Sequence, residues 1–206
     1  LYVVLGHGHS SRTGWVWQGV GGQLQALFGD GAGINGPMWS ADLRDDRWHH
    51  LAAVKSRTDG ASVYLDGQLD GRTAWQTADV VLTGYDLYFA MDPVAGRNLN
   101  GAMDEIRFYD RPLSASEIHA IYQAGSAGVC RRSVCLRAPE GMVSWWPAQD
   151  DAGDIWDGND GTARDVVYEP GKVGLAFGLN GVSSYVDLCN GPNTQASNDF
   201  SVAAWV

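Results

Sequence analysis

The sequence contains 206 residues, 45% of them hydrophobic and 11% aromatic, which is enough for one large β domain or two small ones. A core of that size argues against intrinsic disorder. The sequence has 24 Asp and Glu residues and 14 Lys and Arg residues, which gives a net charge of −10. This charge disfavours nucleic acid and anionic membranes as partners. No apolar run approaches the ~20 residues that a membrane-spanning helix needs.

Short strands separated by Gly and Asp dominate the chain. A strand-like run opens it at 1–5 and another closes it at 202–206, which we interpret as a fragment of a longer protein. After the apolar run 63–65, Asp66 and Gly67 predict a two-residue hairpin, because a type I′ turn needs positive φ at both central positions. Further strands are predicted at 47–55, 87–91, 102–109, 142–146, 175–179, 185–188 and 200–206. The last of these alternates cleanly between two faces.

One segment has the signature of a helix. Ser114 and Glu117 have the spacing of a capping box, in which each side chain bonds the backbone N–H of the other residue. Leu113 before the cap and Ile118 after it predict a hydrophobic staple, and Gly125 supplies a stop. We therefore expect one helix of about three turns in an otherwise all-β chain.

A linker follows the helix at 129–138, within a stretch that is small, basic and without periodicity. The three cysteines are Cys130, Cys135 and Cys189, so at least one is free or pairs outside this sequence. A disulfide near a domain junction is the plainer interpretation. Metal ligation has little support, because no CxxC spacing and no neighbouring His accompany them.

Several motifs resemble the laminin-G-like jelly-roll modules of the concanavalin A-like lectin/glucanase superfamily. The C-terminal hallmarks of such a module lie at 47–54 (RWHHLAAV), 63–67 (VYLDG), 101–109 (GAMDEIRFY) and 111–118 (RPLSASEI). The N-terminal hallmarks lie at 141–147 (GMVSWWP), 170–177, 180–186 and 199–206. The resemblance implies an all-β, antiparallel β-sandwich of the jelly-roll type with one short helix.

The two sets of hallmarks occur in reverse order. Residues 1–128 resemble the last two-thirds of one repeat, and 139–206 resemble the first third of the next. In this fold the opening strand normally lies beside the closing one, so we predict that the two segments close into one circularly permuted sandwich. The alternative is two partial domains, each with unpaired edge strands.

A loop at 150–161 is dense in Asp, Asn and Gly. Calcium prefers six to eight hard oxygen ligands, which such a loop can supply, although the spacing is not that of an EF-hand. The family resemblance implies a calcium site formed by Asp154, Asn159 and, from the closing strand, Asp104. The alternative is that these residue types only form turns.

The strand at 102–109 carries further charged residues. Glu105 and Arg107 are two residues apart, which predicts an ion pair on one face. The alternation places Asp104 on the core side, where its charge would need a partner. The adjacent His49 and His50 point to opposite faces of their strand, so one is expected to be hydrogen-bonded and the other exposed.

Four tryptophans lie in or near Gly-rich connections: Trp15, Trp17, Trp39 and Trp75. Tryptophans of loops stack on sugar rings in lectin-like domains, so these four are the candidate ligand-binding residues, with capping of the sandwich as the alternative. The tryptophans of the hallmark motifs are expected in the core: Trp48, Trp145, Trp146 and Trp205.

These observations predict a non-catalytic, carbohydrate-binding or adhesion module that is assisted by calcium and is secreted or displayed on a cell surface. The Glu-x-Asp-x-x-Glu pattern of related glucanases is absent from the sequence, as are the nucleophile elbow and HExxH motifs. The expected partner is a glycan or an extracellular polysaccharide. The rival is a structural or protein-binding repeat of a large surface protein, and a fragment of a glucanase-type hydrolase is less favoured. If the candidate tryptophans are exposed on one concave patch, carbohydrate binding is favoured over a structural or protein-binding repeat.

Overall fold

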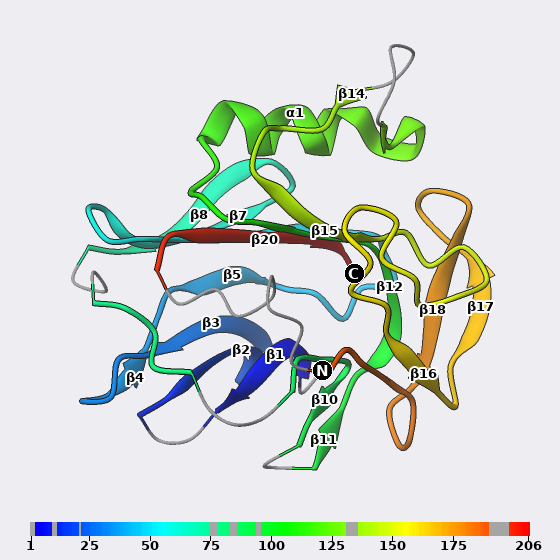
Figure 1. Cartoon of the computed structure of the whole chain (residues 1–206), viewed down its shortest axis with the longest axis horizontal. Coiled ribbons are helices and arrows are strands. Elements are labelled where there is room, and N and C mark those ends of the chain that lie inside the picture. Colours follow the sequence, from blue (N-terminus) through cyan, green and yellow to red (C-terminus); the bar gives the residue numbers. More distant parts are fainter. Residues whose placement is uncertain are drawn as a thin grey trace.

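The computed structural model describes residues 3–9, 12–20, 22–74, 78–82, 86–93, 96–130, 136–189 and 198–206. Two mainly antiparallel sheets face each other, and one α-helix lies outside the second sheet (Figure 1). The predicted all-β sandwich with one short helix is thereby confirmed. Among the helices of the described ranges, none has the length and apolar character that crossing a membrane requires.

The first sheet has the order β16-β19-β9-β1-β2-β3-β4, and β5 also pairs with β3. Its strands are β1 (Val3–His9), β2 (Gly14–Val20), β3 (Gln23–Gly29), β4 (Ile34–Asn35), β5 (Met38–Asp42), β9 (Tyr88–Phe89), β16 (Thr162–Arg164) and β19 (Tyr185–Asp187). A short pair, β10 (Met91–Asp92) and β11 (Arg97–Asn98), follows β9.

The second sheet has the order β17-β18-β12-β20-β6-β7-β8, and β15 also pairs with β12. Its strands are β6 (His50–Ser56), β7 (Gly60–Leu65), β8 (Gln68–Thr73), β12 (Asn100–Tyr109), β15 (Met142–Trp146), β17 (Val167–Pro170), β18 (Leu175–Asn180) and β20 (Phe200–Trp205). The connection after the helix contains the parallel pair β13 (Val129–Cys130) and β14 (Leu136–Arg137).

Strands from the two ends of the chain alternate within both sheets. β20 lies between β12 and β6, and β15 and β18 both pair with β12. In the first sheet, β19 pairs with β9. The segments 1–128 and 139–206 therefore build one sandwich together. Their assignment to two successive repeats stays a prediction.

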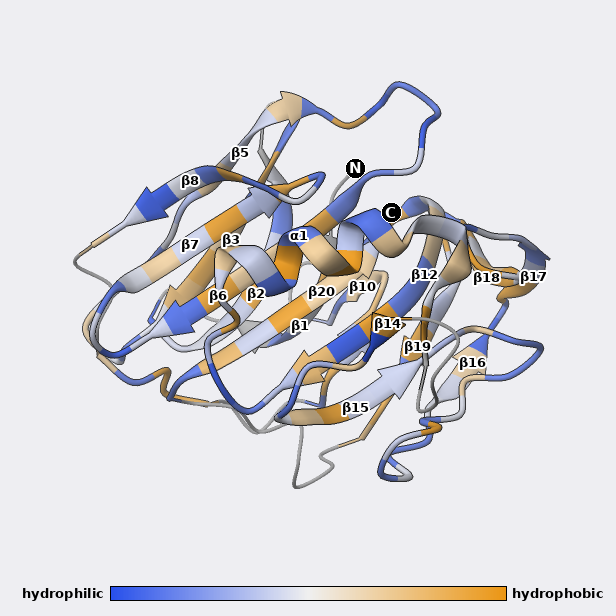
Figure 2. Ribbon diagram, turned by 90° about the horizontal axis from the view of Figure 1, so that it is seen from above, coloured by the Kyte–Doolittle hydropathy of each residue, from blue (hydrophilic) through white to orange (hydrophobic). Residues whose placement is uncertain are grey.

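The core lies between the sheets and follows the period-two alternation of the strands. On β20, Phe200, Val202 and Ala204 belong to this core. Ala203 and Trp205 point to the opposite side, where helix α1 (Ala115–Ala124) covers the sheet. Figure 2 looks down on α1 and shows it lying across the second sheet. Burying a side chain such as Phe200 or Val202 stabilises the folded state by roughly 1.5–3 kcal/mol.

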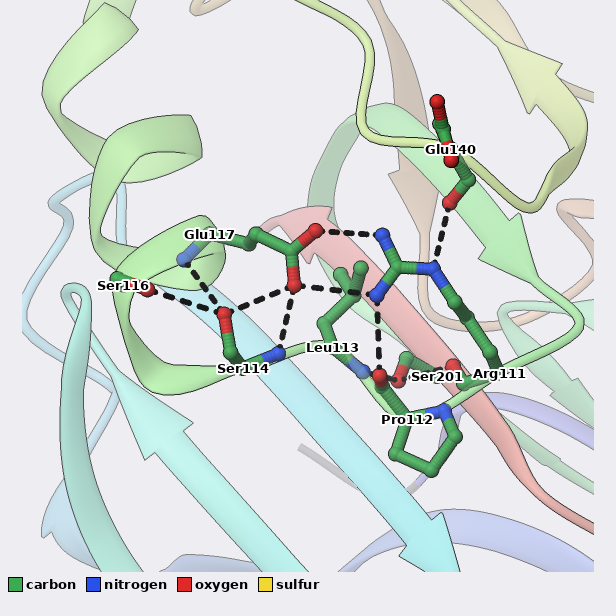
Figure 3. A network of polar contacts seen from close by, with 8 residues as sticks. All are labelled: Arg111, Pro112, Leu113, Ser114, Ser116, Glu117, Glu140 and Ser201. Carbon is green, nitrogen blue, oxygen red and sulfur yellow. Dashed lines mark hydrogen bonds and ion pairs between the residues drawn. The ribbon is translucent and has the colours of Figure 1, made fainter.

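The N-terminus of α1 is tied to β20 by a polar network (Figure 3). The predicted capping box is present: Ser114 Oγ accepts from the Glu117 N–H, and the Glu117 side chain accepts from the Ser114 N–H. Arg111 makes two hydrogen bonds to the same Glu117 carboxylate. The hydroxyl of Ser201 on β20 accepts from the Leu113 N–H at 2.8 Å and donates to the Arg111 carbonyl at 2.9 Å. This network joins the end of one segment to the last strand of the other.

Candidate functional site

The described surface contains an open cleft of about 850 Å³ at one end of the second sheet. Polar and aromatic side chains on its walls include Arg44, Asp46, Arg47, Trp48, Asp165 and Glu169. Small-molecule sites in proteins have volumes of roughly 300–1,000 Å³, so the cleft has the size of a ligand site.

The cleft follows from the different lengths of two neighbouring strands. The ladder between β12 and β20 reaches from Tyr109 to the pair of Asp104 and Trp205. β12 continues beyond this pair to Asn100, which is paired with Asn180 of β18. The connection between β5 and β6 lies across the cleft from this part of β12 and forms the opposite wall.

Gly178 lets the hairpin of β17 and β18 form the second wall. A Cβ at this position would lie 2.7 Å from Cγ2 of Val167 and 2.9 Å from Cδ of Glu169. Both side chains therefore lie over β18 at Gly178, which has no side chain. As a result, Glu169 lies beside the cleft and Val167, which is largely exposed, contributes an apolar surface.

The first wall carries charges of both signs, and the second carries carboxylates. Arg44, Asp46 and Arg47 lie on the first wall, and Asp165 and Glu169 lie on the second. Arg44 is held by a two-point contact with Asp42. The Arg47 side chain is 80% exposed, and its contact to Asp45 is 3.9 Å long, so its guanidinium is available to a ligand. On the first wall, Trp48 is partly exposed.

His49 ends the first wall and is held on both sides of its ring. Its Nδ1 lies 2.9 Å from Asp66 Oδ2, and its Nε2 lies 3.3 Å from Asp45 Oδ1. The His49 backbone exchanges two hydrogen bonds with Val206. We expected one of His49 and His50 to be hydrogen-bonded and the other exposed. Instead, His49 is hydrogen-bonded and partly exposed, whereas His50 is fully buried.

The predicted calcium ligands do not fit a cation. Asp154 Oδ1 accepts from the backbone N–H groups of Trp145 and Trp156, both within 2.9 Å. Asp154 Oδ2 accepts from the backbone N–H and the side-chain amide of Asn159. Both carboxylate oxygens are thus directed at N–H donors, which repel a metal ion. Burial raises the pKa of Asp154, but these donors outweigh it and leave the pKa below its usual value.

Asp104, the third predicted ligand, belongs to a different part of the structure. A β-bulge shifts the register of β12 between Asp104 and Arg107, and Glu105 within it has a φ of 56°. The bulge turns Asp104 away from the core, where it accepts from the Val173 N–H at 2.7 Å. Burial raises the pKa of Asp104 to about 7. The prediction that Asp104 faces the core is therefore wrong.

No three His, Cys, Asp or Glu side chains in the described ranges come together as a metal site. The hydrogen bonds of Asp154 argue against a calcium site at Asp104, Asp154 and Asn159, and that site stays a prediction. Asp154 organises the acidic loop as an acceptor of N–H groups. Cys189 is exposed and free, whereas Cys135 and the side chain of Cys130 lie outside the described residues.

Glu105 and Arg107 form the predicted ion pair, and both side chains are buried. The Arg107 guanidinium lies 5.1 Å from the ring centre of Trp145. His50 lies nearby, and burial, followed by the charges of Arg107 and Lys172, lowers its pKa to about 3. Since helix α1 and its connection cover this face, we assign the cluster a structural role.

The proposed contact of tryptophans with a ligand is wrong for Trp15, Trp17 and Trp39. Each is 0% exposed and belongs to the core cluster between the sheets. The rings of Trp17 and Trp39 pack edge to face at 5.1 Å, and Trp39 Nε1 donates to the Tyr64 carbonyl. Trp75 lies outside the described residues. The alternating Trp15-Val16-Trp17 pattern was a strand signal that the sequence interpretation missed.

Trp48 is the aromatic residue that sequence reasoning assigned to the core and the structure places at the cleft. β6 begins at His50, three residues later than the hallmark motif suggested, so Trp48 lies in the connection before the strand. The run of charged residues immediately before it, 44–47, is the signal that indicated a solvent-facing segment.

Comparison with known proteins agrees with this fold. A family model described as the Concanavalin A-like lectin/glucanases superfamily matches residues 3–119, which is more than half of the chain. No curated protein and no solved structure matches the sequence significantly. The chain therefore belongs to the laminin-G-like domains of the concanavalin A-like lectin/glucanases superfamily.

Proposed function

We propose that this domain is a non-catalytic module that binds carbohydrate in the cleft beside Trp48, without calcium. The observation that carries the proposal is a partly exposed tryptophan in a cleft of about 850 Å³ that is also lined by guanidinium and carboxylate groups. Family membership supports the same class of ligand, since the superfamily contains lectins.

The lining groups match the chemistry of a sugar. The face of a pyranose ring carries C–H groups that pack on an indole ring such as that of Trp48. Sugar hydroxyls donate to carboxylates such as Asp165 and Glu169, and they accept from the guanidinium of Arg47. Because the chain has a net charge of −10, a neutral glycan is favoured over a polyanionic one.

The exposure of the cleft carboxylates supports binding without hydrolysis. A glycosidase needs one carboxylic acid that an apolar environment keeps protonated. Asp46, Asp165 and Glu169 are all exposed to solvent. We therefore expect no release of reducing ends from a bound polysaccharide. A location outside the cell, as is common for such domains, is part of the proposal.

The test is a titration with a panel of neutral oligosaccharides, followed by calorimetry. Trp48→Ala is expected to weaken binding at least tenfold, because the stacking surface is lost, while Trp156→Ala serves as a matched control. Trp156 is also partly exposed but lies in the acidic loop, outside the cleft. Equal loss in both variants, or full affinity of Trp48→Ala, would overturn the assignment. Binding of proteins but of no glycan would favour the rival, a protein-binding repeat.

A further inference from the structure

The first wall of the cleft is a segment held by charge contacts at both ends. Between β5 and β6, the wall contributes Arg44, Asp46, Arg47 and Trp48 to the lining. Arg44 Nε donates to Asp42 Oδ1 at 2.8 Å at the start of the segment. Residues 43–49 belong to no strand, so side-chain contacts hold the segment together with the two backbone hydrogen bonds between His49 and Val206.

At the other end, His49 bridges two carboxylates from different parts of the chain. Asp45 belongs to the wall itself, whereas Asp66 lies in the tight turn between β7 and β8. The His49 side chain is 17% exposed, so the contacts are largely shielded from water. Carboxylates only accept hydrogen bonds, so both contacts are hydrogen bonds only when both ring nitrogens carry protons.

The anchor on the Asp66 side is rigid. Asp66 Oδ1 accepts from the His50 N–H at 2.9 Å, and the Asp66 N–H donates to the His50 carbonyl at 2.9 Å. Asp66 and Gly67 have φ angles of 49° and 77°, as the predicted type I′ turn requires. The turn is therefore fixed, and the ring of His49 holds Asp45 at a set position relative to the turn.

We propose that His49 is a positioning residue for the glycan site, whose ring joins Asp45 to Asp66 and thereby fixes Arg47 and Trp48. The role in ligand binding rests on the proposed function, but the effect on the wall does not. The charged or titratable groups around the ring are Asp45 and Arg47 of the same segment and Asp66 of the turn. From α1, His119 lies against the turn, 3.1 Å from where a Cβ of Gly67 would stand.

Two measurements test the inference, each with His49→Gln and the control His119→Gln on the exposed side of α1. In hydrogen exchange, His49→Gln is expected to lose at least tenfold of the protection of amides 44–48, with β7 and β20 unchanged. In binding, His49→Gln is expected to weaken the affinity for the glycan severalfold, whereas His119→Gln should bind like the wild type.

The outcomes separate the two proposals. If no glycan binds, the proposed function fails, and the exchange of amides 44–48 still decides whether His49 holds the wall. Unchanged exchange of amides 44–48 in His49→Gln would overturn the role of His49. Should His49→Gln fail to fold, Asp45→Ala removes the contact of the ring with the wall and leaves its contact with Asp66, and it is expected to lose a smaller part of the protection of the same amides.

Discussion

The hydroxyl of Ser201 occupies the gap between the Leu113 N–H and the Arg111 carbonyl, at 2.8 Å and 2.9 Å (Figure 3). Ser201 is fully buried on β20, and its two partners precede helix α1. One side chain therefore satisfies two backbone groups from a distant part of the sequence. This contact joins the helix to the strand that the second segment inserts into the sheet.

Replacing Ser201 by Ala is expected to destabilise the domain by about 1–3 kcal/mol, because the Leu113 N–H and the Arg111 carbonyl lose their partner inside the protein. Urea unfolding measures the effect. Ser116→Ala is the matched control, since Ser116 is exposed on α1 and bonds only within the cap. Equal stability of both variants would show that water replaces the hydroxyl without cost.

Calcium is expected to leave the melting temperature unchanged. A ligand that binds only the folded state raises that temperature, and Asp154 directs both oxygens at N–H donors instead of a cation. Thermal melts with millimolar calcium and with excess chelator should coincide. An upward shift with calcium would contradict this interpretation of the acidic loop.

Asp154→Ala is expected to cost roughly 2–4 kcal/mol, because charge-assisted hydrogen bonds to Trp145, Trp156 and Asn159 are lost together. Asp157→Ala, at an exposed position of the same loop, is the control and should change stability by less than about 0.5 kcal/mol. Chemical denaturation of the two variants decides the point. Equal effects would show that Asp154 is not the organising residue.

His50 is expected to destabilise the domain in acid. Burial, together with the charges of Arg107 and Lys172, lowers the pKa of His50 to about 3 from 6.5 in the unfolded chain. The unfolded state thus binds a proton more readily, so stability is lost as the pH falls below about 6.5. The loss should reach about 2 kcal/mol by pH 5, at 1.36 kcal/mol per pKa unit. His50→Phe should flatten this part of the pH profile of unfolding.

Asp104 makes the stability of the domain depend on pH in the opposite direction to His50. Burial raises its pKa from 3.8 to about 7, so the folded state holds the proton more tightly than the unfolded state. The stability that this provides is full below about pH 3.8 and is lost as the pH rises to about 7. Asp104→Asn keeps an acceptor for the Val173 N–H and carries no charge. Its stability relative to the wild type should therefore rise by about 2–4 kcal/mol between pH 4 and pH 8.

Several features could be predicted because they depend on neighbouring residues. The capping box of Ser114 and Glu117 acts within one turn, and the turn at Asp66 and Gly67 needs only two residues of suitable φ. The faces of β20 follow from period-two alternation alone. Motif order indicated two complementary segments, and the strand pairings then join them in one sandwich.

The site could not be predicted, because its geometry depends on contacts between distant segments. The bulge at Glu105 reverses the faces of β12 before Ile106, so local alternation misplaced Asp104. Trp15 and Trp17 entered the core because β2 pairs with β1 and β3, which a Gly-rich neighbourhood concealed.

By itself, the sequence determined the all-β class, the helix, the tight turns and the membership in the family, since these are carried by short patterns of residues. Only the tertiary structure decided that Trp48 lines a cleft, that Asp154 accepts hydrogen bonds from N–H groups, and that His49 joins Asp45 to Asp66. The physical reason is that burial and hydrogen-bond partners are set by which strands become neighbours. That choice belongs to the whole sandwich, not to any one of its segments.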